Sequence, residues 1–318
     1  MDKILLCACG ILSGLLFAEV KDNYSSHNSY NSFGQTGLIQ LPSAQIQNTG
    51  NVGVILNNST IAQILTVTAT PTSWLEASFY YRRTKDTSYT KKGNYLDKGL
   101  NVKVLLLEYN NISFSAGIDD VGGTGLQAKE YIVSSINTSN YRLTLGVGTG
   151  DFSGHRPYQN PISKLRERPA SLFTSKSQTG SEIDFNSFFK GPIGIFAGIE
   201  YRPLFFPKLT FQLETNPFDY NNFLIGGTFS DKTRKLRKKK RNYNIGIHYN
   251  FRNNYSISLS QFKGDGFDIT LSKKFNFNPK KTTINVRKVV AASNEQNKKF
   301  AFYEDILRNL EKDQLYLQ

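Results

Sequence analysis

The chain has 318 residues, a formal net charge of +14 at neutral pH and a mean hydropathy of -0.39. Both cysteines, Cys7 and Cys9, lie at the N-terminus, so the rest of the chain has no disulfide or thiolate chemistry available. No later run approaches the roughly 18 consecutive apolar residues of a membrane-spanning helix. A strongly basic chain attracts phosphate-rich partners, either nucleic acid or the anionic head groups and glycans of a membrane.

Residues 1–18 follow the pattern of a secretory signal peptide, with basic Lys3, an apolar core and small Ala18. The core is too short and too rich in glycine for a spanning helix, and we predict cleavage after Ala18. Cys9 has the spacing of a lipoprotein acceptor, but the apolar core before it, Ile4 to Leu6, is too short for that signal. Because export brings the chain to a membrane, we predict no nucleic-acid partner.

Residues 19–36 are rich in Asn, Ser and Tyr without periodicity, which predicts a flexible leader. From residue 37 to residue 277 the chain alternates between apolar and polar side chains, the pattern of strands with one apolar and one wet face. The clearest runs lie between Tyr243 and Phe277, where each has about nine to eleven residues, the length of a tilted strand across a bilayer. The predicted strands are 50–56, 62–70, 74–84, 99–108, 112–118, 126–136, 141–148, 192–202, 208–216, 243–251, 255–260 and 267–277.

The connections between these strands alternate in length. Short turns at 71–73, 109–111, 138–140, 203–207 and 252–254 alternate with connections that include the long ones, 85–98, 150–191 and 217–241. Outer-membrane barrels have short periplasmic turns and longer external loops. The fold class predicted is therefore all-β, an antiparallel outer-membrane-type β-barrel of about twelve strands. Two further strands, at 183–189 and 223–230, would make about fourteen.

Residues 278–318 differ in character from the barrel. A short β-like run is followed by a polar linker and a helical pattern at Phe302, Ile306 and Leu310. We expect an incomplete periplasmic α/β segment here, because the chain stops as another strand begins.

Five stretches between residues 33 and 216 occur in a specific order: 33–44 (FGQTGLIQLPSA), 71–81 (PTSWLEASFYY), 119–135 (DDVGGTGLQAKEYIVSS), 143–148 (LTLGVG) and 191–201 (GPIGIFAGIEY). As a set they resemble the YjbH family of outer-membrane proteins, which is associated with exopolysaccharide or capsule production. The resemblance implies an exported barrel that works beside polysaccharide secretion machinery and is not a known enzyme. Members of that family are much longer, so we expect this chain to be a short form or one part of a split reading frame.

Six charged side chains share the parity that faces the lumen: Arg82, Arg142, Arg202, Glu76, Glu200 and Glu214. One interpretation is a ladder of ion pairs that fills a narrow barrel. The other is a passage lined for a charged glycan, because guanidinium groups pair with carboxylates and phosphates.

The basic run Lys238, Lys239, Lys240 and Arg241 precedes the last three strands. In an external loop it would contact lipopolysaccharide phosphates, although plain solvation explains it as well. His27, His155 and His248 are isolated, so we predict no metal site and no cofactor. The spacing of the carboxylates does not suggest a glycosidase, and we predict no catalytic residues.

Together these features predict a non-enzymatic outer-membrane barrel that assists exopolysaccharide or capsule secretion or assembly. The alternatives are a general porin and a surface-interaction barrel that presents long external loops. The expected partners are the outer membrane and its lipopolysaccharide, together with a polysaccharide and periplasmic export proteins.

Overall fold

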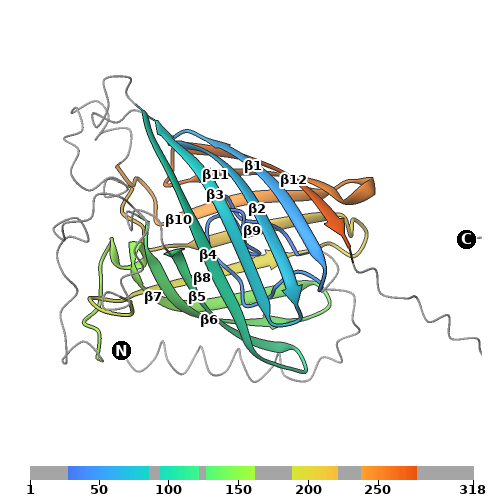
Figure 1. Ribbon diagram of the computed structural model, residues 1–318, viewed down its shortest axis with the longest axis horizontal. Coiled ribbons are helices and arrows are strands. Elements are labelled where there is room, and N and C mark those ends of the chain that lie inside the picture. Colours follow the sequence, from blue (N-terminus) through green and yellow to red (C-terminus); the bar gives the residue numbers. More distant parts are fainter. Residues whose placement is uncertain (1–27, 86–93, 122–126, 162–187, 221–237, 278–318) are drawn as a thin grey trace, which may run out of the picture. The chain divides into compact units, whose positions relative to one another are not determined.

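The strands of this protein form a closed antiparallel barrel (Figure 1). A computed structural model describes residues 28–85, 94–121, 127–161, 188–220 and 238–277. Each strand pairs with its neighbours in the chain, and β1 pairs with β12 to close the wall. The strands are β1 (Asn51–Ser59), β2 (Ala62–Thr72), β3 (Leu75–Lys85), β4 (Asn94–Tyr109), β5 (Ile112–Val121), β6 (Lys129–Asn137), β7 (Tyr141–Gly150), β8 (Gly194–Tyr201), β9 (Leu209–Thr215), β10 (Tyr243–Asn250), β11 (Tyr255–Phe262) and β12 (Gly266–Asn276).

These twelve strands confirm the predicted fold class. Of the two further strands considered, 223–230 lies outside the described residues, and so does 183–189 except for its last two residues, which form a turn. The predicted signal peptide, residues 1–18, and the α/β segment, residues 278–318, also lie outside the described residues and stay predictions. Among the residues that are described, no helix has the length and apolar character needed to cross a membrane.

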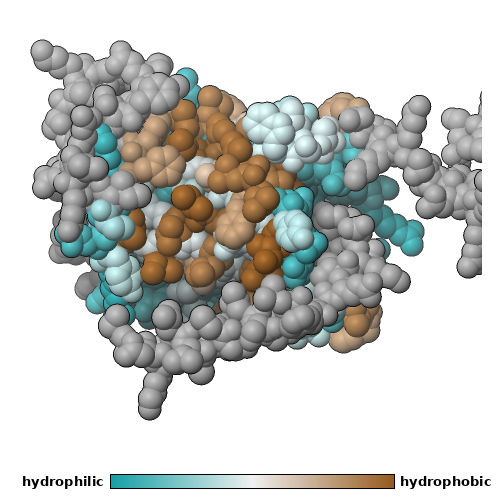
Figure 2. Space-filling model, turned by 90° about the horizontal axis from the view of Figure 1, so that it is seen from below, coloured by the Kyte–Doolittle hydropathy of each residue, from teal (hydrophilic) through white to brown (hydrophobic). Residues whose placement is uncertain are grey.

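Alternation along each strand separates an apolar outer face from a polar lumen. In β10, Asn244 and His248 are 2% and 1% exposed, whereas Ile245 and Ile247 are 45% and 41% exposed. Figure 2 shows large apolar side chains gathered on one outer face. Around the whole barrel, exposed large apolar side chains come from most strands and include Leu56, Leu65, Phe79, Leu100, Ile132, Leu145, Ile195, Leu213, Ile269 and Leu271. An apolar belt of this kind makes the protein membrane-associated.

The two ends of the barrel differ in the lengths of their connections, as predicted. At one end, which we call the short-turn end, strands are joined at 73–74, 110–111, 138–140, 202–208 and 251–254. At the other, the long-loop end, they are joined at 60–61, 86–93, 122–128, 151–193, 216–242 and 263–265. Asn51 at the start of β1 pairs with Asn276 at the end of β12, so the wall begins and ends at the short-turn end.

Residues 28–49, which we call the plug, lie inside the barrel and not in its wall (Figure 1). Nearly all of them are buried, and Thr36, Leu41 and Ser43 are 0% exposed. This differs from the flexible leader expected over residues 19–36, of which residues 28–36 are packed in the lumen. The barrel wall also begins later than residue 37, at Asn51.

The plug holds its shape through its own hydrogen bonds. The Asn31 side-chain oxygen accepts the N–H groups of Phe33 at 3.0 Å and Gln35 at 3.1 Å, which makes a tight turn. Gly34 has φ +84 in this turn, and a Cβ there would lie 2.4 Å from the Thr66 Cβ on the wall. Only glycine fits both the backbone conformation and the space.

Candidate functional site

The lumen is the candidate site, because charged side chains of the wall bind the plug there. Glu76 of β3 accepts the Thr36 N–H at 2.9 Å and also the Thr36 hydroxyl. Lys103 of β4 lies 3.0 Å from Glu76 and donates to the Thr36 carbonyl at 2.8 Å. The side chains of Glu76 and Lys103 are 1% and 0% exposed, so this ion pair depends on Thr36 for its remaining hydrogen bonds.

Glu214 of β9 binds the plug through the backbone. Its carboxylate accepts the N–H groups of Ile39 at 3.0 Å, Gln40 at 3.1 Å and Leu41 at 3.2 Å. Asn244 of β10 donates to the same carboxylate at 2.8 Å. Three successive backbone N–H groups thus surround one carboxylate, the arrangement by which peptide backbones bind anions.

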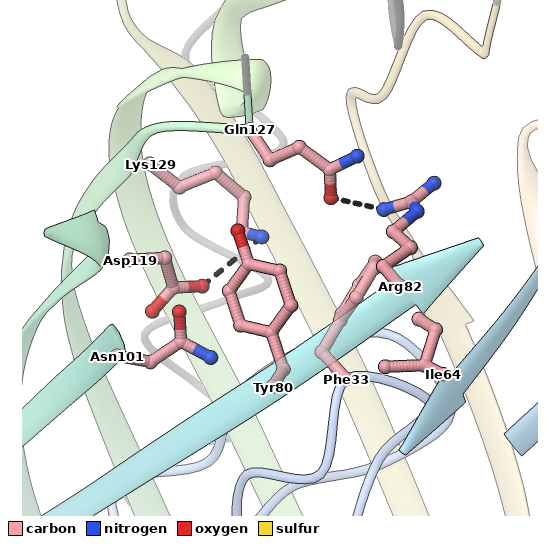
Figure 3. A pocket seen from close by; sticks show the side chains of 8 residues that line it. All are labelled: Phe33, Ile64, Tyr80, Arg82, Asn101, Asp119, Gln127 and Lys129. Carbon is pink, nitrogen blue, oxygen red and sulfur yellow. Dashed lines mark hydrogen bonds and ion pairs between the residues drawn. The ribbon is translucent and has the colours of Figure 1, made fainter. Parts of the chain in front are cut away.

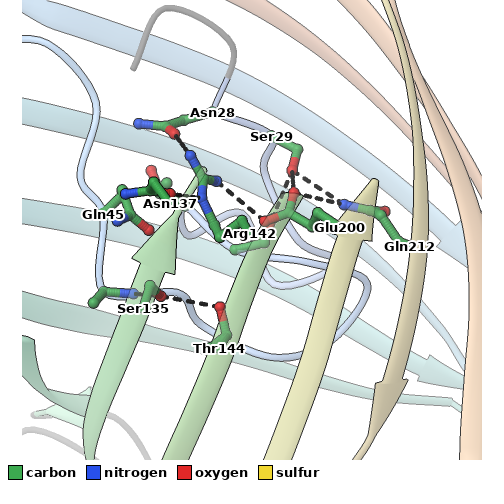
Figure 4. A network of polar contacts seen from close by, with 12 residues as sticks. Asn28, Ser29, Gln45, Ser135, Asn137, Arg142, Thr144, Glu200 and Gln212 are labelled. Atoms are coloured by element: carbon green, nitrogen blue, oxygen red, sulfur yellow. Dashed lines mark hydrogen bonds and ion pairs between the residues drawn. The ribbon is translucent and has the colours of Figure 1, made fainter. Parts of the chain in front are cut away.

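Arg142 of β7 joins two strands and the start of the plug (Figure 4). Its guanidinium lies 3.1 Å from Glu200 of β8 and donates to the side-chain oxygens of Asn28 at 2.7 Å and Asn137 at 2.8 Å. The plug hydroxyl of Ser29 donates to the other oxygen of Glu200 at 3.4 Å. This ion pair is therefore buried and completed by neutral plug groups.

A further wall carboxylate, Asp119 of β5, contacts the turn of the plug (Figure 3). It forms an ion pair of 3.0 Å with Lys129 of β6 and accepts the Gln35 amide at 2.6 Å. The Lys129 ammonium also lies 4.3 Å from the centre of the Phe33 ring, within the range of a cation–π contact. The plug thus supplies both an amide and an aromatic face to one ion pair.

Arg82 of β3 lies beside this group and donates to the Gln127 side-chain oxygen. A cavity of about 10 Å³, roughly the size of one water molecule, lies between Arg82 and the group around Asp119. Its lining residues are Phe33, Ile64, Tyr80, Arg82, Asn101, Asp119, Gln127 and Lys129 (Figure 3). With the plug in place, this cavity has no room for a sugar.

Aromatic side chains pack above the plug at the long-loop end. The Phe152 ring stacks on Phe196 at 4.5 Å and on Phe218 at 5.1 Å, and Phe33 of the plug meets Phe218 edge-on at 6.2 Å. We call the wall and loop members of this group the aromatic cap: Phe152, Phe196, Phe218, Tyr220 and Phe262, each 0% exposed. The cap and the plug together fill the described lumen.

The six predicted lumen residues all face inward, and they are between 1% and 7% exposed. Arg142 and Glu200 form an ion pair with each other. Glu76 pairs with Lys103 instead, and Glu214 binds backbone N–H groups. The backbone of Arg202 donates to the Asn140 carbonyl at 2.7 Å, at the short-turn end. Whether any of the six touches a glycan is not tested by this arrangement and stays a prediction.

Sequence reasoning missed Lys103, Lys129 and Asp119, and it missed the plug itself. Lys103 lies between the apolar, partly exposed Val102 and Val104, so the parity rule could have found it. Lys129 gives no such signal, because its neighbours Ala128 and Glu130 are both buried. The plug has no periodicity, and its main signal is that it contains no charged residue while the wall around it contains many.

The predicted basic run lies at the long-loop end, before β10. Lys238, Lys240 and Arg241 are exposed, and Lys240 forms an ion pair of 2.8 Å with Asp265. Lys239 is half-buried and donates to the Asn216 carbonyl. Burial lowers the pKa of Lys239 to about 8, against the opposing attraction of Glu214 and Asp219.

Fully buried charged residues of the described chain show no cationic excess, although the whole chain carries +14. Half-buried Lys274 adds one cation, which bonds the Asn28 carbonyl. No three potential ligands among His, Cys, Asp and Glu gather as a metal site within the described ranges. The fully buried acids are Glu76, Asp97, Asp119, Asp120, Glu130, Glu200, Glu214 and Asp268, and the fully buried bases are Arg82, Lys103, Lys129, Arg142, Arg202 and Lys263.

Comparison with known proteins finds relatives of this chain. The YjbH family model, described as "Exopolysaccharide biosynthesis protein YbjH", matches residues 29–316. The chain is 28% identical over 265 residues to the "Uncharacterized lipoprotein YjbH" of Escherichia coli (strain K12). That alignment covers 81% of this chain and 36% of the relative, so the chain spans about a third of the relative's length.

Two solved structures illustrate the likeness of the fold. One is the KdgM porin, with a TM-score of 0.38 and 10% identity, over 71% of this chain and 99% of the porin. Another is OprD of Pseudomonas aeruginosa, with a TM-score of 0.28 and 12% identity, over 73% of this chain and 68% of OprD. Since the family model covers most of the chain, this protein belongs to the YjbH family of exopolysaccharide biosynthesis proteins.

Proposed function

We propose that the protein is a non-enzymatic barrel of the outer membrane that assists the secretion or assembly of an exopolysaccharide or capsule. Membership of an exopolysaccharide biosynthesis family is the observation that carries this proposal. The closed wall and its apolar outer belt support a barrel that lies in a membrane. A bacterial membrane that holds antiparallel barrels of this kind is the outer membrane.

Deletion of the gene tests this function. We expect the amount of cell-surface polysaccharide to fall several-fold and to return when the full chain is supplied from a plasmid. The protein should fractionate with the outer membrane and run faster on a gel before boiling than after it. An unchanged amount and length of polysaccharide in the deletion strain would contradict the proposal.

A general porin is the alternative, and the filled lumen argues against it. Arg82, Arg142 and Lys103 are each 1% exposed, which is expected of a lumen packed by the plug and not of an open pore. Single-channel recording separates the two functions, because a porin conducts continuously and a plugged barrel does not. The loops that a surface-interaction barrel would present, within 162–187 and 221–237, lie outside the described residues.

The basic run at the long-loop end supports contact with lipopolysaccharide. Lys238, Lys240 and Arg241 are exposed cations beside the apolar belt, where phosphate groups of that lipid lie. Replacing all three with Gln should reduce the lipopolysaccharide that copurifies with the barrel. Gln replacement of the exposed lysine Lys208, at the short-turn end, is the matched control. Equal loss in both variants would contradict a contact at this rim.

A further inference from the structure

The plug is chemically different from the wall that holds it. Residues 28–49 contain no Asp, Glu, Lys, Arg or His, and they are rich in Asn, Gln, Ser and Thr. The wall presents buried carboxylates and cations to the plug, and these charges include Glu76, Glu214 and Lys103. The plug groups that form hydrogen bonds with these three residues are a hydroxyl and backbone N–H and C=O groups.

These plug groups have the hydrogen-bonding character of a neutral sugar chain. The hydroxyls of Thr36 and Ser29 donate to wall carboxylates as sugar hydroxyls do, and the Gln35 amide donates to Asp119 as an acetamido group does. Phe33 meets the Phe218 ring edge-on at 6.2 Å, so the plug also places an apolar group against an aromatic side chain, as the apolar C–H groups of a pyranose can. The plug therefore offers the wall neutral donors, neutral acceptors and one aromatic ring.

The wall charges determine which ligand could replace the plug. A buried carboxylate that loses its donors must receive new ones, because a buried charge without hydrogen-bond partners is strongly unfavourable. Glu214 would lose the N–H groups of Ile39, Gln40 and Leu41 if the plug left. A polyanionic glycan brings more carboxylates to a lumen that already has no cationic excess. A hydroxyl-rich or acetamido-rich neutral glycan brings the donors that Glu214 needs.

We infer that the plug occupies the binding site of a neutral, hydroxyl- or acetamido-rich glycan, and that the two exchange in the lumen. This rests on the proposed function for its polymer, and it names the chemical class of that polymer. Glu76, Glu200 and Glu214 accept hydrogen bonds from the glycan, and the aromatic cap stacks on its rings. The anionic glycan considered from the sequence is thereby replaced by a neutral one.

Competition between plug and glycan is measurable by cysteine labelling. Ser43 is 0% exposed, and the chain after residue 18 has no cysteine, so Ser43→Cys in the purified mature chain gives a single buried thiol. An impermeant maleimide should label it slowly. Adding the neutral hexamer of N-acetylglucosamine should raise the labelling rate at least fivefold, because bound glycan keeps the plug out. A hexamer of galacturonate at the same concentration should leave the rate unchanged.

A second variant weakens the plug without changing the wall. In Gln35→Glu, a new carboxylate faces Asp119, which accepts the Gln35 amide at 2.6 Å in the native chain, and like charges repel there. The concentration of neutral hexamer for half-maximal labelling of Ser43→Cys should fall at least tenfold, because less of the protein is plugged. Gln45→Glu is the matched control, since its amide donates to the Ser113 hydroxyl, which can also donate to a carboxylate.

Each outcome decides the inference. It is overturned if the galacturonate hexamer accelerates labelling as much as the neutral one, or if neither oligomer does. If Gln35→Glu does not fold, the competition on Ser43→Cys alone gives the same decision. Glycan binding in this assay together with an unchanged polysaccharide in the deletion strain would reject the proposed cellular function and keep the site. Loss of polysaccharide in the deletion strain without glycan binding in this assay would keep the proposed cellular function and reject the site.

Discussion

At the scale of single residues, the ion pair between the wall residues Arg142 and Glu200 binds the start of the plug. Both side chains are buried, and Asn28 completes the hydrogen bonds of the guanidinium. Removing one member of a buried ion pair leaves the other charge without compensation. The plug therefore depends on a wall contact that lies near the short-turn end, where residue 28 meets the barrel.

Glu200→Ala tests the strength of this contact. We expect the free energy of unfolding to fall by about 3–5 kcal/mol, because Arg142 remains buried without its carboxylate. The double variant Arg142→Met/Glu200→Met should lose less free energy of unfolding than the single variants Arg142→Met and Glu200→Met lose in sum. Guanidinium unfolding in detergent, followed by circular dichroism, measures these differences. A loss in the double variant equal to that sum would show that the two side chains act independently.

Lys239 makes stability depend on alkaline pH. Its pKa in the folded protein is lowered to about 8 by burial, whereas the pKa of an unfolded lysine is about 10.4. Between these values the unfolded state binds more protons, so stability rises with pH there and is lowest, as far as this group is concerned, below pH 8. Lys239→Met should remove this rise. Lys240→Met should keep it, since the Lys240 side chain is 60% exposed.

At the scale of single elements, the position of a side chain along a strand decides the cost of a charge in the membrane. Ile247 lies in the middle of β10, and Tyr243 is the first residue of β10. Both side chains are on the outer face. Ile247→Arg should cost about 2–4 kcal/mol, as at a bilayer midplane, and Tyr243→Arg about 0–1 kcal/mol. Unfolding in lipid vesicles measures both. Equal costs would contradict the assignment of this face to lipid.

The wall strands could be predicted from the sequence, because neighbouring residues of a strand face lipid and lumen in turn and differ in polarity accordingly. Asn244 and Ile245 differ in chemistry and face opposite sides, as expected. The plug could not be predicted in this way, since its contacts are made by backbone groups and amides without period. The ion-pair partner of Glu76 could not be predicted from the sequence either. It is Lys103 and not an arginine, because the pairing of β3 with β4 places Lys103 directly opposite Glu76.

At the scale of the whole molecule, the orientation of the barrel follows from its unequal ends. External loops of outer-membrane barrels are longer than periplasmic turns, so the long-loop end should face outward. Asn242→Cys, at the long-loop end, should react with an impermeant maleimide on intact cells. Ser139→Cys, in an exposed turn at the short-turn end, should react only after the cells are opened. The reverse pattern would invert the orientation.

The seam between β1 and β12 sets the order of events in assembly. Asn51 pairs with Asn276, so the wall cannot close until its last strand has been made, although the plug is made before its first. Contacts between residues so distant along the chain form slowly. Until the wall closes, the plug is a segment without charged side chains and has no complete lumen around it. Burial of the plug is therefore gained when the ring closes, and loss of either seam strand deprives the plug of its enclosure.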